Sequence, residues 1–265
     1  MLNTYCHNHL KFAANLDCLF TEFTFLDRFK QAKLAGFNGV ECLRPYNEEV
    51  KLIKQALIDN QLQMILINAP SGNENERGTA SLINRDTDFK ASIKLAQLYA
   101  STLSCSKIHV LSGNRDSNVP FEDQYQQLIK NMRFAADYFK TYNITLLIEP
   151  LNPFDMPSYL INNLEMADKV ITDINRCNVA LQFDMFHCQR MQGNILYYFE
   201  KYQSIISHIQ IASSPYRNEP DRGEINYAWL FSQIEKMNYC QWIGCEYQPE
   251  NTTLAGLGWF VERKK

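Results

Sequence analysis

The sequence lacks the features that would place the protein in a membrane, in the secretory pathway or on nucleic acid. No window approaches the ~20 consecutive apolar residues that a membrane-spanning helix requires. The N-terminus, MLNTYCHNHLKF, has neither an apolar core nor a small-residue cleavage site, so we expect no secretory signal. A formal net charge of −3 and a pI near 6.0 provide no basic field for nucleic acid. We therefore expect a cytoplasmic protein.

The sequence also lacks any C-x-x-C pair, although it contains eight cysteines. Cys42, Cys240 and Cys245 lie within or beside apolar, strand-like runs, which favours buried and reduced thiols over disulfides. The run Cys6-His7-Asn8-His9 superficially resembles metal-ligand spacing. We interpret residues 1–9 instead as a poorly ordered leader ahead of the first strand, because chain termini are seldom ordered.

Strand-like and helix-like stretches alternate along the whole chain. The strand-like runs cover 10–16, 39–43, 63–69, 107–113, 144–150, 179–185, 208–213 and 240–247. The helix-like stretches between and after them cover 22–35, 47–60, 85–103, 121–142, 163–174, 194–206 and 226–238. Most of the strand-like runs are continuously apolar, which is typical of parallel strands covered by helices.

This alternation predicts a single (β/α)8 TIM barrel spanning residues 1–265. A doubly wound open sheet is the competing fold, but no G-x-G-x-x-G follows the first strand and no Pro/Gly/Ser-rich linker divides the chain. The longer connections at 70–84 and 214–225 follow strands, so we expect them on the C-terminal face, where barrel enzymes keep their active sites.

Carboxylates and an amide close the last four predicted strands. Glu149 ends the run ITLLIEP, and a lone ionised carboxyl is costly to bury without a partner. Asp184, Gln210 and Glu246 hold comparable positions on the following strands. Each of them alone could cap a helix or pair with a basic neighbour. Together they predict one oxygen-rich site, which suits Mg²⁺ or Mn²⁺ better than zinc.

Further polar residues are expected on the same rim. Glu41 ends the second strand, and His109 in the fourth is either a hydrogen-bonded core residue or a site residue. His187 follows the sixth strand, and Arg217 lies in the loop after the seventh. Arg217 is either a solvated loop charge or a planar seat for an anionic substrate. Arg85 is a further candidate for that seat, and all five are predicted substrate-binding residues.

The ordered motifs resemble the hydroxypyruvate isomerase and 2-oxo-tetronate isomerase family, which belongs to the xylose-isomerase-like barrels. The matching stretches run from near residue 10 to the C-terminus: FAANLDCLFTE, GVECLRPY, LINAPSG, IHVLSG, LIEPLN, QFDMFHCQ, GNI, HIQIA, GEINYAWLF, WIGCEY and GLGWF. The resemblance implies that Glu149 and Glu246 are the proton donor/acceptor pair. It also implies that Glu149, Asp184, Gln210 and Glu246 bind the divalent metal.

The implied reaction converts hydroxypyruvate to 2-hydroxy-3-oxopropanoate, or isomerises 2-oxo-tetronate, by proton transfer through an enediolate. The partner would thus be a small anionic metabolite, and the sequence leaves open both its length and assembly into a homo-oligomer. Two departures affect substrate contacts: the family's P-G-D reads P-S-G-N after the third strand, and its P-G-R reads Ile83-Asn84-Arg85.

Alternative functions on the same scaffold remain open. Ketose 3-epimerases usually place a metal-binding His where this chain has Gln210, which favours an isomerase. Apurinic endonucleases need several His-rich zinc sites and a basic DNA-facing surface, whereas this chain has five His and an acidic balance. A non-catalytic barrel that binds a metabolite is the third hypothesis.

Overall fold

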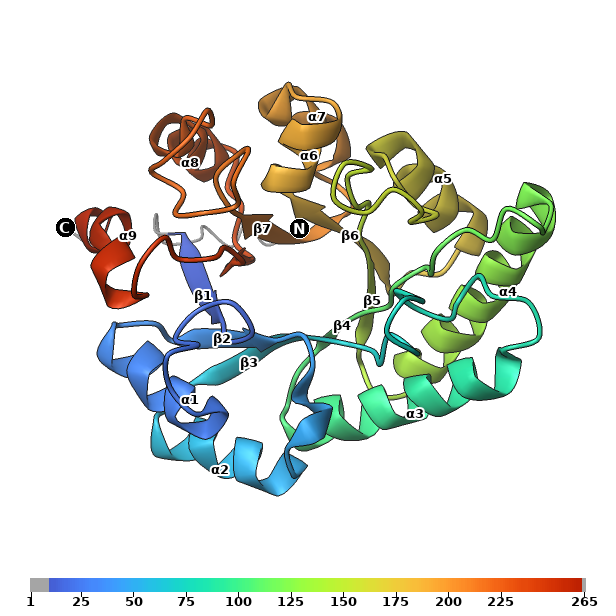
Figure 1. Ribbon diagram of the computed structural model, residues 1–265, viewed down its shortest axis with the longest axis horizontal. Helices are drawn as coiled ribbons and strands as arrows, with labels where there is room; N and C mark the ends of the chain where they lie inside the picture. The colour runs from blue at the N-terminus through green and yellow to red at the C-terminus, as the bar shows by residue number, and fades with distance from the viewer. Residues whose placement is uncertain (1–9, 264–265) are drawn as a thin grey trace, which may run out of the picture.

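Eight parallel strands close into a barrel in chain order, as Figure 1 shows for the computed structural model, which describes residues 10–263. Each strand pairs with the next one in the sequence, and β1 pairs with β8 to close the ring. The strands are β1 (Lys11–Asn15), β2 (Gly39–Cys42), β3 (Gln63–Asn68), β4 (Lys107–His109), β5 (Thr145–Ile148), β6 (Val179–Asp184), β7 (Ile206–Ile211) and β8 (Trp242–Cys245).

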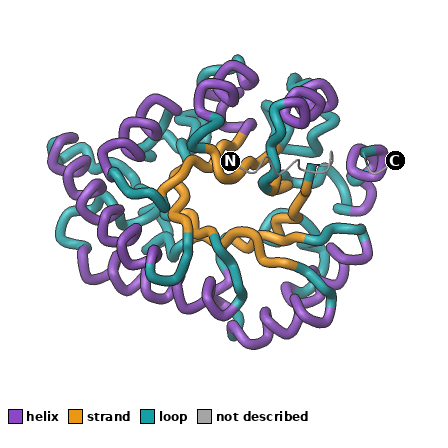
Figure 2. The backbone as a smooth tube through the Cα atoms, turned by 180° about the vertical axis from the view of Figure 1, so that it is seen from behind, coloured by secondary structure: helices purple, strands orange, loops and turns teal. Residues whose placement is uncertain are grey.

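Helices form an outer ring around this barrel, and Figure 2 shows the same arrangement from behind. The α-helices are α1 (Phe25–Leu34), α2 (Val50–Asp59), α3 (Asp86–Thr102), α4 (Phe121–Lys140), α5 (Leu164–Ile174), α6 (Met185–Met191), α7 (Ile195–Tyr202), α8 (Tyr227–Lys236) and α9 (Gly258–Glu262). Two 3₁₀ turns, η1 (Pro45–Asn47) and η2 (Leu254–Gly256), complete the set for the described residues. The predicted (β/α)8 barrel is confirmed.

The strands separate apolar from polar side chains by the alternation inherent in a pleated strand. Ile108, Phe183 and Ile209 are fully buried and belong to the apolar layer between the strands and the helices. Residues next to them in sequence, such as His109 and Gln210, are buried and polar. The barrel interior therefore has an unusually polar lining, which needs internal hydrogen bonds to be stable.

The floor of the barrel, at the N-terminal ends of the strands, is filled by side chains. A Cβ added to Gly39 would lie 2.7 Å from the Trp242 ring and 2.8 Å from Ile65, so these two side chains pack directly on the glycine. Lys107 reaches across from β4 and donates to the Ser207 carbonyl and to Gln241 Oε1. Burial lowers the pKa of Lys107 to about 8 because desolvation disfavours the ammonium.

The connections at the opposite end form the mouth. The segments between β3 and α3 and between β7 and α8 follow strand C-termini, as expected for 70–84 and 214–225. A third long connection, 149–163, separates β5 from α5. The short helix α6, which begins directly after β6, was not predicted, because the sequence analysis assigned no element between the strand at 179–185 and the helix at 194–206.

The prediction of reduced cysteines is confirmed for Cys18, Cys42, Cys105, Cys177, Cys188 and Cys245, which are free thiols. It is wrong for Cys240, which is disulfide-bonded. The reason is local: Cys240 precedes β8 in a partly exposed turn and is not part of the buried strand. The run Cys6-His7-Asn8-His9 and the predicted leader lie outside the described residues. Between residues 10 and 263, the search for an apolar helix of membrane-spanning length found none.

Candidate active site

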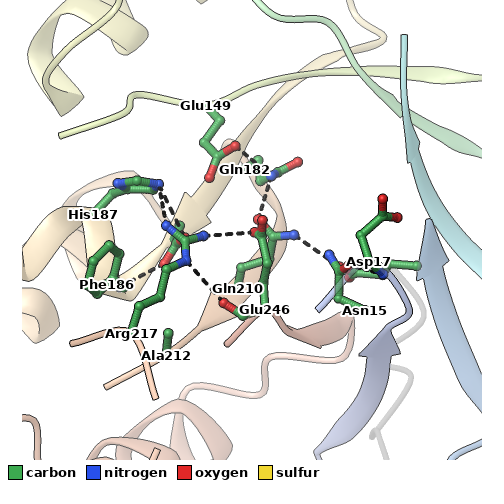
Figure 3. Close-up of polar contacts among 12 residues, drawn as sticks. Asn15, Asp17, Glu149, Gln182, Phe186, His187, Gln210, Ala212, Arg217 and Glu246 are labelled. Carbon is green, nitrogen blue, oxygen red and sulfur yellow. Dashed lines mark hydrogen bonds and ion pairs between the residues drawn. The ribbon is translucent and has the colours of Figure 1, made fainter. Parts of the chain in front are cut away.

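Four predicted ligands gather at the mouth from consecutive strands. Asp184 is the last residue of β6 and is paired in register with Gln210 of β7. Glu149 and Glu246 are the first residues after β5 and β8. Asp184, Gln210 and Glu149 are buried, and the Glu246 side chain is 13% exposed. The structure thus brings all four residues to one end of the barrel, as Figure 3 shows for the three labelled members.

The two oxygens of Glu149 have different environments. Oε2 accepts a hydrogen bond of 2.9 Å from Gln182 and lies 3.4 Å from His109 Nδ1. Oε1 is buried and has no hydrogen-bond partner among the described residues. Burial raises the pKa of Glu149 well above its usual range, and the nearby carboxylates of Glu246 and Asp184 raise it further.

Asp184 serves both the site and the local fold. Its Oδ1 accepts from the backbone N–H of Phe186 at 2.7 Å and so caps the N-terminus of α6. Its Oδ2 lies 3.3 Å from Arg217 Nη2. Burial raises the pKa of Asp184, while Arg217 and the two α6 backbone N–H groups oppose that rise.

Arg217 lies between the carboxylates of Asp184 and Glu246. Its Nη2 is 3.2 Å from Glu246 Oε2, its Nε donates to the Glu246 carbonyl at 3.3 Å, and its guanidinium stacks on the Phe186 ring at 4.7 Å. Burial still raises the pKa of Glu246 to about 8, although Arg217 opposes the shift. Arg217 is therefore placed to compensate the charge of both carboxylates.

The neutral tautomer of His187 can be assigned from its neighbours. The Asn152 side-chain oxygen accepts from the backbone N–H groups of Phe154 and Asp155, which directs its Nδ2 toward His187 Nδ1 at 2.7 Å. The Asn152 backbone N–H also donates to Nδ1, so the ring proton is on Nε2. Burial, reinforced by Arg217, lowers the pKa of His187 well below its usual value.

The remaining predicted substrate-binding residues occupy three different positions. His109 lies beside Glu149 and is neutral, because burial lowers its pKa to about 3. Glu41 lies deeper, fully buried, where it accepts from Gln210 Nε2 at 3.0 Å. The guanidinium of Arg85 is paired with Glu76 and Asp88, which neutralise it on the connection between β3 and α3.

The sequence analysis missed three buried residues that support the site: Gln182, His208 and Asn152. Gln182 and His208 precede Asp184 and Gln210 by two positions, so strand alternation places each on the inward face of the barrel. That periodicity could have identified both residues. Nothing comparable marks Asn152, which lies in the connection after β5.

The residues present fit a divalent cation. Ligand atoms of Glu149, Asp184 and His187 all lie within 4.8 Å of one another, and the first two belong to the predicted ligand set. Glu149 and Asp184 are buried carboxyl groups, and a bound cation would compensate their charge. The donor set is dominated by carboxylate and amide oxygens, which hard cations prefer.

Comparisons with known proteins agree with this fold. The family model described as a xylose isomerase-like TIM barrel matches residues 29–263. Hydroxypyruvate isomerase of Escherichia coli is 40% identical over 252 residues, covering 94% of this chain and 98% of that protein. 2-Oxo-tetronate isomerase of Haemophilus influenzae is 39% identical over 256 residues, covering 96% of this chain and 99% of that protein.

Solved structures show the same architecture. A crystal structure from Brucella melitensis, described as an AP endonuclease of family 2, has a TM-score of 0.93 and 41% identity, covering 96% of this chain and 98% of that one. A 3-keto-D-glucoside 4-epimerase from E. coli has a TM-score of 0.81 at 18% identity, over 96% of this chain and 99% of that one, which shows a shared fold. The chain belongs to the xylose isomerase-like TIM barrels and, within them, to the hydroxypyruvate isomerase and 2-oxo-tetronate isomerase family, and it is an isomerase.

Proposed function

We propose that this protein isomerises a small hydroxy-oxo acid, hydroxypyruvate or 2-oxo-tetronate, by moving a proton between adjacent carbons. This proposal is supported above all by two carboxyl groups at the mouth, the buried Glu149 and the mostly buried Glu246, which lie near Arg217 and His187. The names of the curated relatives supply the substrate class. The proposed partner is therefore a small anionic metabolite.

The two carboxyl groups suit general acid–base catalysis. For hydroxypyruvate, one carboxylate takes a proton from C3 and the other group delivers a proton to C2, which passes through an enediolate. Burial raises the pKa of Glu246 to about 8, near the range that suits a general acid or base at neutral pH, and burial also raises the pKa of Glu149. The unpartnered Oε1 of Glu149 is the oxygen available for this transfer.

A divalent cation, Mg²⁺ or Mn²⁺, held by Glu149, Asp184, Gln210 and Glu246 would supply Lewis acidity to the substrate oxygens. Arg217 and His187 are proposed to hold the substrate carboxylate. Arg217 Nη1 and the protonated His187 Nε2 lie 3.1 Å apart, and neither can accept from the other. A carboxylate oxygen of the substrate could accept a hydrogen bond from each of these two donors.

The site composition favours this function over that of a zinc nuclease. Within residues 10–263 the histidines are His109, His187 and His208, and His208 lies below the cluster beside Glu41. One oxygen-coordinated cation fits this set better than several His-rich zinc sites.

The test is to incubate the protein with hydroxypyruvate, and separately with 2-oxo-tetronate, in D₂O with Mg²⁺ or Mn²⁺, and to record NMR spectra. From hydroxypyruvate we expect the aldehyde 2-hydroxy-3-oxopropanoate, and from 2-oxo-tetronate we expect the 3-oxo isomer, each with solvent deuterium at C2. The Glu149→Gln variant is the control for protein-catalysed exchange. A product that keeps its ketone and differs only in configuration would identify an epimerase. Neither exchange nor product with either acid would refute the proposal.

A further inference from the structure

A buried amide, Gln182, contacts the proposed base from below. It lies on β6 two residues before Asp184, and its side chain is directed into the barrel between Glu149 and Gln210 (Figure 3). It is 1% exposed. Its one amide nitrogen donates to Glu149 Oε2 at 2.9 Å and to Gln210 Oε1 at 2.6 Å.

These contacts fix which way the Gln182 amide faces. Both partners are oxygens that accept, so rotating the amide by half a turn would place its carbonyl oxygen against two other oxygens. Its own Oε1 makes no hydrogen bond to the described residues. The orientation therefore depends on the Gln210 oxygen being turned toward Gln182.

Glu41 determines the orientation of Gln210. Glu41 Oε2 accepts from Gln210 Nε2 at 3.0 Å and from Asn15 Nδ2 at 3.3 Å, while His208 Nε2 lies 2.5 Å from Oε1. A carboxylate among nitrogen donors requires the Gln210 nitrogen to point inward, which turns its oxygen outward. The Glu41 carboxylate fits here only because residue 244 is a glycine: a Cβ at that position would lie 2.2 Å from Glu41 Oε1.

The chain of contacts makes the two oxygens of Glu149 unequal. Oε2 is held by Gln182, whereas Oε1 is buried and lacks a partner among the described residues. A carboxylate with one oxygen fixed by a hydrogen bond presents the other in a defined direction, which is the preorganisation that proton transfer needs.

We propose that Gln182 is a positioning residue that selects the reactive oxygen of Glu149, and that Glu41 sets its orientation through Gln210. The inference deepens the proposed isomerase function and rests on it. Neither Gln182 nor Glu41 is assigned contact with the substrate. Both act through Glu149, so their loss should change kcat rather than KM.

The first variant is Gln182→Met, which removes the N–H donors and keeps an unbranched side chain of similar length. At saturating metal we expect kcat to fall ~10- to 100-fold, the scale of one hydrogen bond to a charged group, with KM changed less than about threefold. Gln124→Met is the matched control: Gln124 is another buried amide, whose Nε2 donates to the carbonyls of Asp116 and Val119 away from the site. It should lower the melting temperature and leave kcat unchanged.

The second variant is the nearly isosteric Glu41→Gln, which keeps the proposal testable if Gln182→Met folds poorly. Because residue 41 can then donate, Gln210 is no longer held in one orientation, and we expect kcat to fall at unchanged KM. Gln182→Met combined with Glu41→Gln should be no slower than Gln182→Met alone, because both changes break one chain. Multiplying effects would show that Glu41 acts independently and would overturn that part of the proposal.

If the kcat of Gln182→Met lay within about twofold of wild type, Gln182 would only fill space, because the loss of one hydrogen bond to a charged group should lower kcat by more than that. A raised KM at constant kcat would place it in substrate binding, which also overturns the proposal. If the wild-type protein turned over neither acid, the proposed function would fail, and the positioning would still be measurable by NMR. The Gln182 side-chain amide protons should then exchange slowly and shift in Glu149→Gln; an unshifted signal would refute the contact.

Discussion

Replacing Glu246 by Gln should make the metal-free protein less sensitive to alkaline pH. The pKa of Glu246 rises from an ordinary 4.5 to about 8 on folding, mainly because the carboxyl is desolvated. A raised pKa means that the group favours the folded state fully below pH 4.5, and that this contribution is lost as the pH rises through 8.

The magnitude follows from the linkage between proton binding and folding. Between the two pKa values the stability falls by about 1.4 kcal/mol per pH unit. From pH 6.5 to pH 9 the Glu246 contribution therefore falls by roughly 2 kcal/mol, since the slope flattens above the folded pKa. The Glu246→Gln variant has no such titration and should not show this loss.

The assay is urea denaturation of both proteins after chelation of metals, at pH 6.5 and at pH 9. Lys107, whose pKa is lowered from 10.5 to about 8, adds stability as the pH rises from 8 toward 10.5. Both proteins retain Lys107, so its contribution cancels, and the difference between wild type and variant reports the Glu246 charge together with its effect on Glu149. An unchanged difference at the two pH values would show that Arg217 keeps Glu246 ionised at neutral pH, contrary to the burial argument.

Three further predictions test the site directly. Glu149→Gln should lower kcat at least ~10²-fold, which is the usual effect of removing a general acid or base, and should leave the circular dichroism spectrum unchanged. Near-normal turnover would assign the proton transfer to another residue. Arg217→Lys keeps the charge but loses the planar fork, so it should slow hydroxypyruvate turnover and leave neutral glyceraldehyde little affected. Equal effects on both would mean that Arg217 does not seat the carboxylate. Mg²⁺ or Mn²⁺ should raise the melting temperature of the wild type. At a free metal concentration of about 100 times Kd, the free energy of unfolding should rise by about 2.7 kcal/mol, and Asp184→Asn should reduce that rise.

The arrangement of the strands was predictable, because apolar runs and helix-like stretches alternate with a regular period. The convergence of Glu149, Asp184, Gln210 and Glu246 followed from that order, since each residue ends a strand and neighbouring strands share a rim. The contacts inside the barrel were not predictable in the same way. They depend on which residues face each other across the ring.

Two local irregularities illustrate why. The β2–β3 register shifts between Val40 and Glu41, and the β6–β7 register shifts between Leu181 and Gln182. Alternation along one strand cannot reveal such shifts, because they are properties of a pair of strands. The pairing of Arg217 with Asp184 and Glu246 was also hidden, since it depends on how the loop after β7 folds back. The left-handed backbone of Arg217, with φ of 58°, belongs to that turn.

The floor of the barrel and the carboxyl groups of the site lie at opposite ends of the strands. Trp242 packs on Gly39 and Lys107 is tethered across the floor, whereas the carboxyl groups face the mouth. A proton removed from the substrate and held by a carboxyl group there either exchanges with solvent or returns to the substrate. The fraction of product formed without deuterium in D₂O would therefore compare two times: the lifetime of the bound intermediate, and the time needed for the held proton to exchange with solvent.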